Sequence, residues 1–232
     1  CQNCHQPHTS GSRERLLNYQ AEEDNCAACH NGNVAGKDVM TVFNQFSSHP
    51  IRDTLEVHDP AETSVVANRH VECSDCHNPH AARAGSSAVT GPLLGVRGID
   101  INGIELDPII ETYQLCFRCH ADSPGRPPAP TPRQIEQTNT RLEFRLTNPS
   151  FHPLAGPGRN PDVPSLISPL SPVSTIGCTD CHNSNAAPSA GGAGPEGPHG
   201  SAFEPILVRQ YLTLDNTPES PSSYALCYSC HD

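Results

Sequence analysis

All twelve cysteines of this chain, and six of its thirteen histidines, occur in one repeated pattern, Cys-x-x-Cys-His. Two thiols three residues apart can bond the two vinyl groups of one porphyrin, and the histidine that follows can bind its iron. The six motifs therefore predict six covalently attached c-type haems. The cysteines are Cys1, Cys4, Cys26, Cys29, Cys73, Cys76, Cys116, Cys119, Cys178, Cys181, Cys227 and Cys230. The motif histidines, expected as proximal iron ligands, are His5, His30, His77, His120, His182 and His231.

Zinc sites and disulfides are the other common uses of paired cysteines. A structural zinc site groups four thiolates or imidazoles, and a secreted disulfide scaffold pairs its cysteines at varied spacings. Neither explains a histidine directly after every second cysteine. The pattern therefore favours haem over both.

The motifs fall into three pairs, which we interpret as three repeats of a two-haem module. The first motif of each pair is followed by a Pro-His dipeptide, which ends at His8, His80 or His199, and then by an apolar stretch. We expect a single hexahaem domain over 1–232. Its modules would cover 1–30, 73–120 and 178–231, joined by linkers 31–72 and 121–177.

Seven histidines lie outside the motifs, enough for a second axial ligand on every iron. Three of them recur after the first motif of each module, and two recur before proline in the two linkers. Of the other two, we favour His58 over His70 as the sixth distal ligand. The predicted distal ligands are His8, His49, His80, His152, His199 and His58.

A histidine three residues after the proximal ligand lies on the same side of its own haem. His8 and His80 must therefore serve other haems. We expect His80 to reach back to the first module and His199 to the second. His8 has no earlier module in its own chain, so it either folds back or binds a haem of another copy.

The composition is too poor in large apolar residues for an ordinary core. Hydrophobic residues make up 35% of the chain, without tryptophan and with one methionine, and there are 24 prolines and 17 glycines. We therefore expect mostly irregular chain with short helices, wrapped around a row of haems. Thr131-Pro132 predicts the start of a short helix, and the alternation of Leu142, Phe144 and Leu146 predicts a short strand.

The formal net charge is −11, which disfavours binding to nucleic acid or to an anionic membrane surface. No apolar run approaches the roughly 20 residues that span a bilayer. Haem is attached to such motifs outside the cytoplasmic membrane, so we expect an exported protein. A start on a haem cysteine is typical of a processed mature chain.

The chain resembles the doubled-CxxCH multihaem c-type cytochromes in the segment from Arg69 to His80, in Gly197-Pro-His199, and in both His-Pro linkers. Some members with six haems in three pairs form extracellular filaments, or nanowires. The resemblance implies a homopolymer that passes electrons to external acceptors or other cytochromes. It also implies that His8 binds a haem of the neighbouring subunit.

Two other functions remain open from the sequence. One is a soluble monomeric electron shuttle of the periplasm. The other is a multihaem redox enzyme, which needs an iron with an open position. All six motifs end in histidine, and the seven other histidines are enough to give every iron a distal ligand. We therefore expect an electron-transfer protein and not an enzyme.

Overall fold

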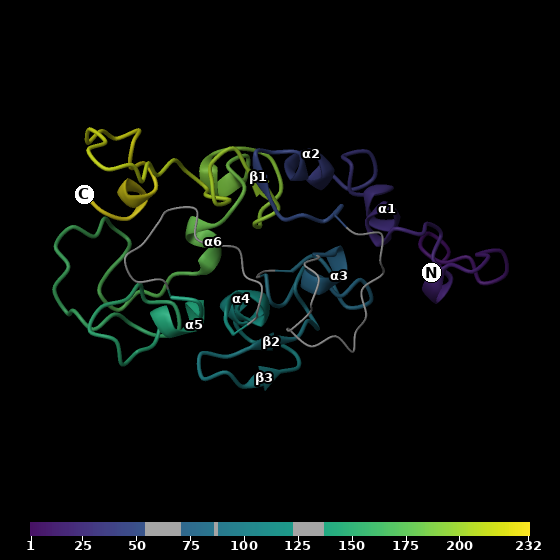
Figure 1. Cartoon of the computed structure of the whole chain (residues 1–232), viewed down its shortest axis with the longest axis horizontal. Helices are drawn as coiled ribbons and strands as arrows, with labels where there is room; N and C mark the ends of the chain where they lie inside the picture. Colours follow the sequence, from purple (N-terminus) through teal and green to yellow (C-terminus); the bar gives the residue numbers. More distant parts are fainter. Residues whose placement is uncertain (54–70, 86–87, 123–136) are drawn as a thin grey trace.

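The computed structural model describes residues 1–53, 71–85, 88–122 and 137–232. The two chain ends lie at opposite ends of its long axis (Figure 1). Between them, α1 (Glu22–Ala27), α3 (Cys73–Cys76), α4 (Thr112–His120) and α6 (Cys178–Cys181) follow one another along this axis. These four helices carry or enter the second to fifth motifs, so the motifs are arranged in space in their sequence order.

The rest of the described chain is mostly irregular, which confirms the expected fold class of coil with short helices. The frequent prolines and glycines account for this, because they interrupt helices and strands. The other helices are α2 (Val39–Phe43), α5 (Thr140–Glu143), η1 (Glu14–Leu16), η2 (Pro188–Ala190) and η3 (Cys227–Ser229). The strands are β1 (Ser47–Ser48), β2 (Gly98–Ile99), β3 (Glu105–Leu106) and β4 (Gly200–Ser201).

Each haem motif is one helical turn. In five motifs the backbone N–H of the histidine donates to the carbonyl of the first cysteine, at 2.7 to 3.0 Å. The fourth motif, Cys116 to His120, is the last part of α4. Residues three and four apart lie on the same side of such a turn. Both thiols and the imidazole of a motif are therefore presented together.

Helix α4 is the centre of a small apolar core. Its start is capped by Gln114, whose side-chain oxygen accepts from the backbone N–H of Glu111 at 3.0 Å. Tyr113 and Phe117 are buried on one face of the helix and pack with Leu154. Other large apolar side chains are exposed, among them Phe46 at 80%. The described peptide thus has a compact core only around the fourth motif.

Strands β1 and β4 join the first linker to the third predicted module. They pair antiparallel, with Ser47 opposite Ser201 and Ser48 opposite Gly200. A Cβ on Gly200 would lie 2.2 Å from the carbonyl oxygen of Val42 in α2, so only glycine fits there. This close approach brings the segment that carries His49 next to the segment that carries His199.

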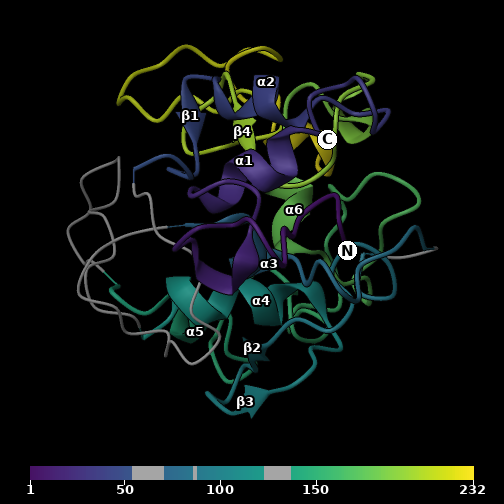
Figure 2. The same cartoon turned by 90° about the vertical axis from the view of Figure 1, so that its right-hand side faces the viewer.

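The two small sheets lie on opposite sides of the long axis. Strands β2 and β3 form an antiparallel hairpin with Gly98 opposite Leu106. In both views, α2 and β1 lie on one side of the molecule and this hairpin on the other, with α3, α4 and α6 between them (Figures 1 and 2). The motif helices therefore occupy the middle of the structure.

The predicted strand through Leu142, Phe144 and Leu146 is wrong, because this segment begins with helix α5. The Asn139 side chain caps the helix by accepting from the backbone N–H of Arg141 at 3.1 Å. These local hydrogen bonds outweigh the alternation of apolar residues. The helix predicted at Thr131-Pro132 lies outside the described residues.

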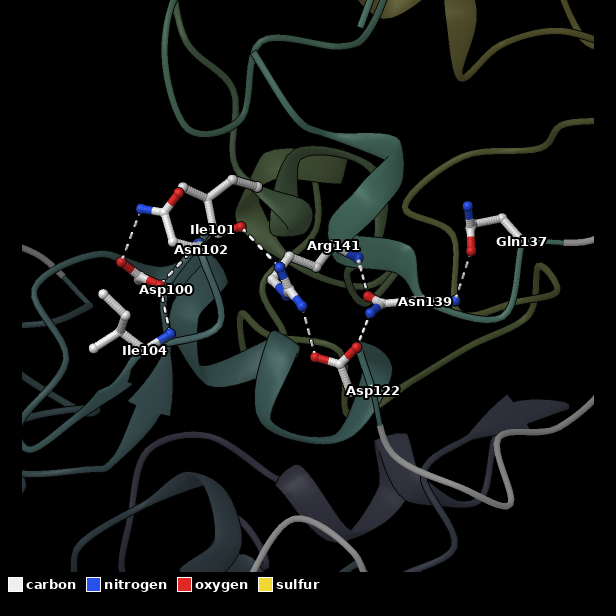
Figure 3. A network of polar contacts seen from close by, with 8 residues as sticks. All are labelled: Asp100, Ile101, Asn102, Ile104, Asp122, Gln137, Asn139 and Arg141. Atoms are coloured by element: carbon white, nitrogen blue, oxygen red, sulfur yellow. Dashed lines mark hydrogen bonds and ion pairs between the residues drawn. The ribbon is translucent and has the colours of Figure 1, made fainter. Parts of the chain in front are cut away.

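Arg141 ties this region to α4 and to the β2–β3 hairpin (Figure 3). Its guanidinium contacts the carboxylate of Asp122 at 2.7 Å and donates to the carbonyl of Ile101 at 3.2 Å. Asp122 also accepts from Asn139. Asp122 follows His120 by two residues, so this network holds the chain directly after the fourth motif.

Across the described ranges, none of the helices has the length and apolar character needed to cross a membrane.

Candidate haem sites

None of the twelve motif cysteines, all of which lie in the described ranges, is paired in a disulfide. Each motif presents its two thiols and its histidine from one helical turn, as thioether attachment to a porphyrin requires. Within the described ranges, no cluster of three or more His, Cys, Asp or Glu side chains could hold a metal ion. A haem iron needs only two protein ligands, because the porphyrin supplies the other four.

Three motif histidines face a second imidazole from a distant part of the chain. The ring centres of His5 and His80 lie 6.2 Å apart, with 8° between the ring planes. Those of His77 and His199 also lie 6.2 Å apart, at 20°. The third pair is His49 and His120, at 6.2 Å and 60°.

This common spacing fits two imidazoles that share one metal. A metal-bound imidazole nitrogen lies about 2 Å from the metal, so the ring centres of two such ligands on opposite faces lie about 6 Å apart. Direct stacking of two rings would allow a closer approach. The donor set of two facing imidazoles beside two thiols therefore fits a c-type haem with two axial histidines.

Backbone carbonyls orient the first histidine of each predicted module. The Nδ1 atom of His5 lies 2.9 Å from the Arg15 carbonyl. The Nδ1 atoms of His77 and His182 each lie 3.0 Å from a proline carbonyl, that of Pro92 and Pro205 respectively. A proton on Nδ1 leaves Nε2 as the metal-binding atom. Pro92 and Pro205 begin the apolar stretches of the second and third modules, and Arg15 directly precedes that of the first.

Burial favours the neutral imidazole at two of the expected distal ligands, His49 and His199. Burial and the neighbouring His77 ring lower the pKa of His199 to about 4. Burial also lowers the pKa of His49, whose Nδ1 lies 2.7 Å from the carbonyl of Pro198. A neutral imidazole is the form that binds a metal. Phe43 packs edge-on against the His199 ring and restricts its orientation.

Successive motifs touch through their first cysteines. Helices α1 and α3 are in contact, and the neighbouring thiols of Cys26 and Cys73 affect each other, which lowers the pKa of Cys26 and raises that of Cys73. Cys116 and Cys178 form the same contact. The second motif therefore adjoins the third, and the fourth adjoins the fifth. Both contacts cross the boundary between predicted modules.

The second cysteines adjoin one another within a module. Burial, together with the neighbouring Asp75 and Cys119, raises the pKa of Cys76 to about 12. Burial, together with the neighbouring Cys230 and Asp180, raises the pKa of Cys181 to about 11. The third motif is thus close to the fourth, and the fifth to the sixth. Motifs two to six form a continuous series.

Two charged side chains at the contact between the third and fourth motifs are not among the predicted site residues. Asp75 and Arg118 occupy the variable positions of the third and fourth motifs and contact each other. The motif pattern alone could not identify them, because their types vary from motif to motif. Their opposite charges were the only available signal.

The remaining predicted ligands are not brought to a facing ring. His8 and His152 are exposed, and in the part of the chain that the structure describes no second imidazole faces His30, His182 or His231. His8 lines an open hollow of about 250 Å³ together with His5 and Thr9. His58 and His70 lie outside the described residues.

Comparison with known proteins gives two matches. The family of the doubled CXXCH motif matches residues 1–35. The chain is also 26% identical over 125 residues to the multiheme cytochrome MtrA of Shewanella baltica (strain OS185). That alignment covers 54% of this chain and 25% of the relative, so the chain spans about a quarter of the relative's length. No solved structure matches.

Proposed function

We propose that this multihaem c-type cytochrome carries electrons along a row of six bis-histidine haems, as the subunit of an extracellular filament. The three pairs of facing imidazoles at 6.2 Å carry the proposal. When bound, haem would supply one-electron chemistry at its iron. The residues of this chain would hold each haem by two thioethers and two imidazoles, which would leave no open position for a substrate.

The proposed ligand pairs connect the predicted modules. His80 serves the iron of His5, and His199 serves the iron of His77, so each first haem takes its distal ligand from the following module. His49 of the first linker serves the iron of His120. By the same repetition His152 serves the sixth motif, and His58 or His70 the second.

The proposed path follows the order of the motifs. Thiol contacts connect the second motif with the third and the fourth with the fifth. Neighbouring second cysteines connect the third motif with the fourth and the fifth with the sixth. With both chain ends at opposite ends of the long axis, this arrangement favours entry and exit of electrons at the two ends.

The proposed filament contact joins His8 of one copy to the fifth motif of another. In this proposal the haem of His182, the first of the third predicted module, takes its distal ligand from the first module of the neighbouring copy. His8 is the corresponding histidine at the opposite end of the chain, and it is exposed. A contact between two different ends is head-to-tail, and it grows into a filament unless a ring closes.

A His8→Ala variant tests the filament. The protein should be produced with haem attached in an exporting host and viewed by negative-stain electron microscopy. We expect filaments for the wild type, and single subunits with one high-spin iron for the variant. Thr9→Ala, in the same hollow, is the control and should still assemble. Assembly of the His8→Ala protein with every iron low-spin would contradict the proposed contact.

The monomeric shuttle is the alternative outcome of the same experiment. Single wild-type subunits whose six irons are all low-spin would favour it. A wild-type protein that binds carbon monoxide at an iron would instead favour an enzyme. The relative MtrA is named only as a multiheme cytochrome, and both the filament and the shuttle agree with that description.

A further inference from the structure

A half-buried ion pair lies between the third and fourth motifs. Arg118 donates to the backbone carbonyl of Asp75 at 3.1 Å, and its Nη2 lies 3.8 Å from the Asp75 carboxylate. The two side chains are only 13% and 14% exposed. Both charges act on the thiols of Cys76 and Cys119, which would carry one thioether of each haem.

The third module has the same carboxylate without the arginine. Asp180 occupies the position of Asp75, and each caps its own turn: Asp75 accepts from the backbone of Glu72 at 2.9 Å, and Asp180 from Gly177 at 2.7 Å. The position of Arg118 is taken by Ser229. Among the described residues, no cation forms an ion pair with Asp180.

The charge beside a haem sets the balance between its ferric and ferrous forms. A nearby cation disfavours the more positive ferric iron and raises the reduction potential, whereas a carboxylate lowers it. The effect is strong for a pair shielded from water and weaker for an exposed group such as Asp180, because solvent screens it.

We infer that Arg118 is a potential-setting residue, which neutralises Asp75 and keeps the haems of the third and fourth motifs at higher potential than an unpaired carboxylate would allow. At the corresponding place between the fifth and sixth motifs, the Asp180 carboxylate has no ion-pair partner among the described residues. The ion pair therefore makes the middle of the row differ in potential from its C-terminal end. This inference rests on the proposed attachment of six haems.

An exchange of the two equivalent residues tests the inference. Spectroelectrochemical titration of the holoprotein gives six midpoint potentials for each variant. In Arg118→Ser, two of the six should fall, with about a tenfold change in the ferric-to-ferrous equilibrium, or ~59 mV for a one-electron step. In Ser229→Arg, two others should rise by a smaller amount. Asp180→Asn should also raise those two.

Three further variants separate charge from folding. Asp75→Asn should raise the two potentials that Arg118→Ser lowers. The double variant Asp75→Asn/Arg118→Ser should return these two potentials close to the wild-type values. Arg118→Lys, which keeps the charge, should leave them nearly unchanged. If Arg118→Ser fails to fold, the sign of the Asp75→Asn shift still decides. Six low-spin haems with potentials unmoved by Asp75→Asn and Arg118→Ser would overturn this inference alone. A protein without six haems would overturn the proposed function.

Discussion

His80 lies just after the third motif in the sequence, but its ring lies beside the histidine of the first motif. It follows His77 by three residues, yet its ring faces His5 in a nearly parallel orientation. The distance between their ring centres, 6.2 Å, leaves room for one metal between them. In the proposed function the unit that binds an iron is a pair of histidines from distant segments, and the pair of His5 and His80 would also join the first two predicted modules.

A His80→Ala variant should open the iron of the first motif and no other. We expect one high-spin haem in its electron paramagnetic resonance spectrum, and carbon monoxide binding at one site after reduction. His199→Ala should give the same result for the third motif. Arg83→Ala, three residues further along the same loop and exposed, is the control. An all low-spin His80→Ala protein would mean that His5 takes its partner from elsewhere.

At the scale of elements, short segments do the positioning that long helices do in other proteins. The β1–β4 ladder has two residue pairs, and its close contact with α2 requires glycine at position 200. This ladder sets His49 and His199 beside each other, and each of them faces a motif histidine of α4 or of the turn after α3. A small change in the ladder would therefore disturb two sites together.

Gly200→Ala should destabilise the holoprotein. Its Cβ would meet the Val42 carbonyl oxygen at 2.2 Å, and relief of such overpacking costs typically about 1 to 3 kcal/mol. We expect a lower midpoint of thermal unfolding, with the two haems served by His49 and His199 affected first. The matched control is Gly36→Ala, because nothing lies within 4 Å of the Cβ that would be added there. Equal melting curves for the two variants would contradict this account.

The Arg141 network makes a second prediction at this scale. Asp122→Asn removes the counter-charge of a guanidinium that is 9% exposed, and an unpaired buried charge is costly. We expect a loss of about 1 to 3 kcal/mol in the free energy of unfolding, measured by denaturant titration. Arg159→Ala, which removes only exposed hydrogen bonds to loop carbonyls, should change it little. A similar loss in both variants would show that the network has no special role.

The sequence was sufficient for features that depend on local spacing. The motif turns, the preference for irregular chain and the placing of the His80 ring away from His77 all follow from residues a few positions apart. Contacts between segments that are far apart in the sequence could not be predicted from it. Nothing near His49 points to His120, and the contact of Asp75 with Arg118 requires two motifs to be packed together. At Leu142 to Leu146 the apolar alternation was outweighed by the Asn139 cap and the buried Arg141.

For the whole molecule, the central question is what stabilises a chain with so little apolar core. The buried cluster around Tyr113 and Phe117 is small, and residues such as Phe46 and Leu214 are 80% exposed. Ordering each residue costs about 1 to 2 kcal/mol of conformational entropy, which this cluster cannot offset over the whole length. The attached haems would bury the exposed apolar side chains and connect distant segments through their axial ligands.

Removal of one haem should therefore have an effect that depends on its place in the row. The double variant Cys116→Ala/Cys119→Ala removes the attachment site at the centre, next to the apolar core and in contact with Cys178. We expect a misfolded or degraded product, detected by limited proteolysis and a lost thermal transition. Cys1→Ala/Cys4→Ala removes an exposed site at the end of the chain. That control should yield a folded five-haem protein. A central variant as stable as the terminal one would show that the peptide, and not the haem row, holds the fold.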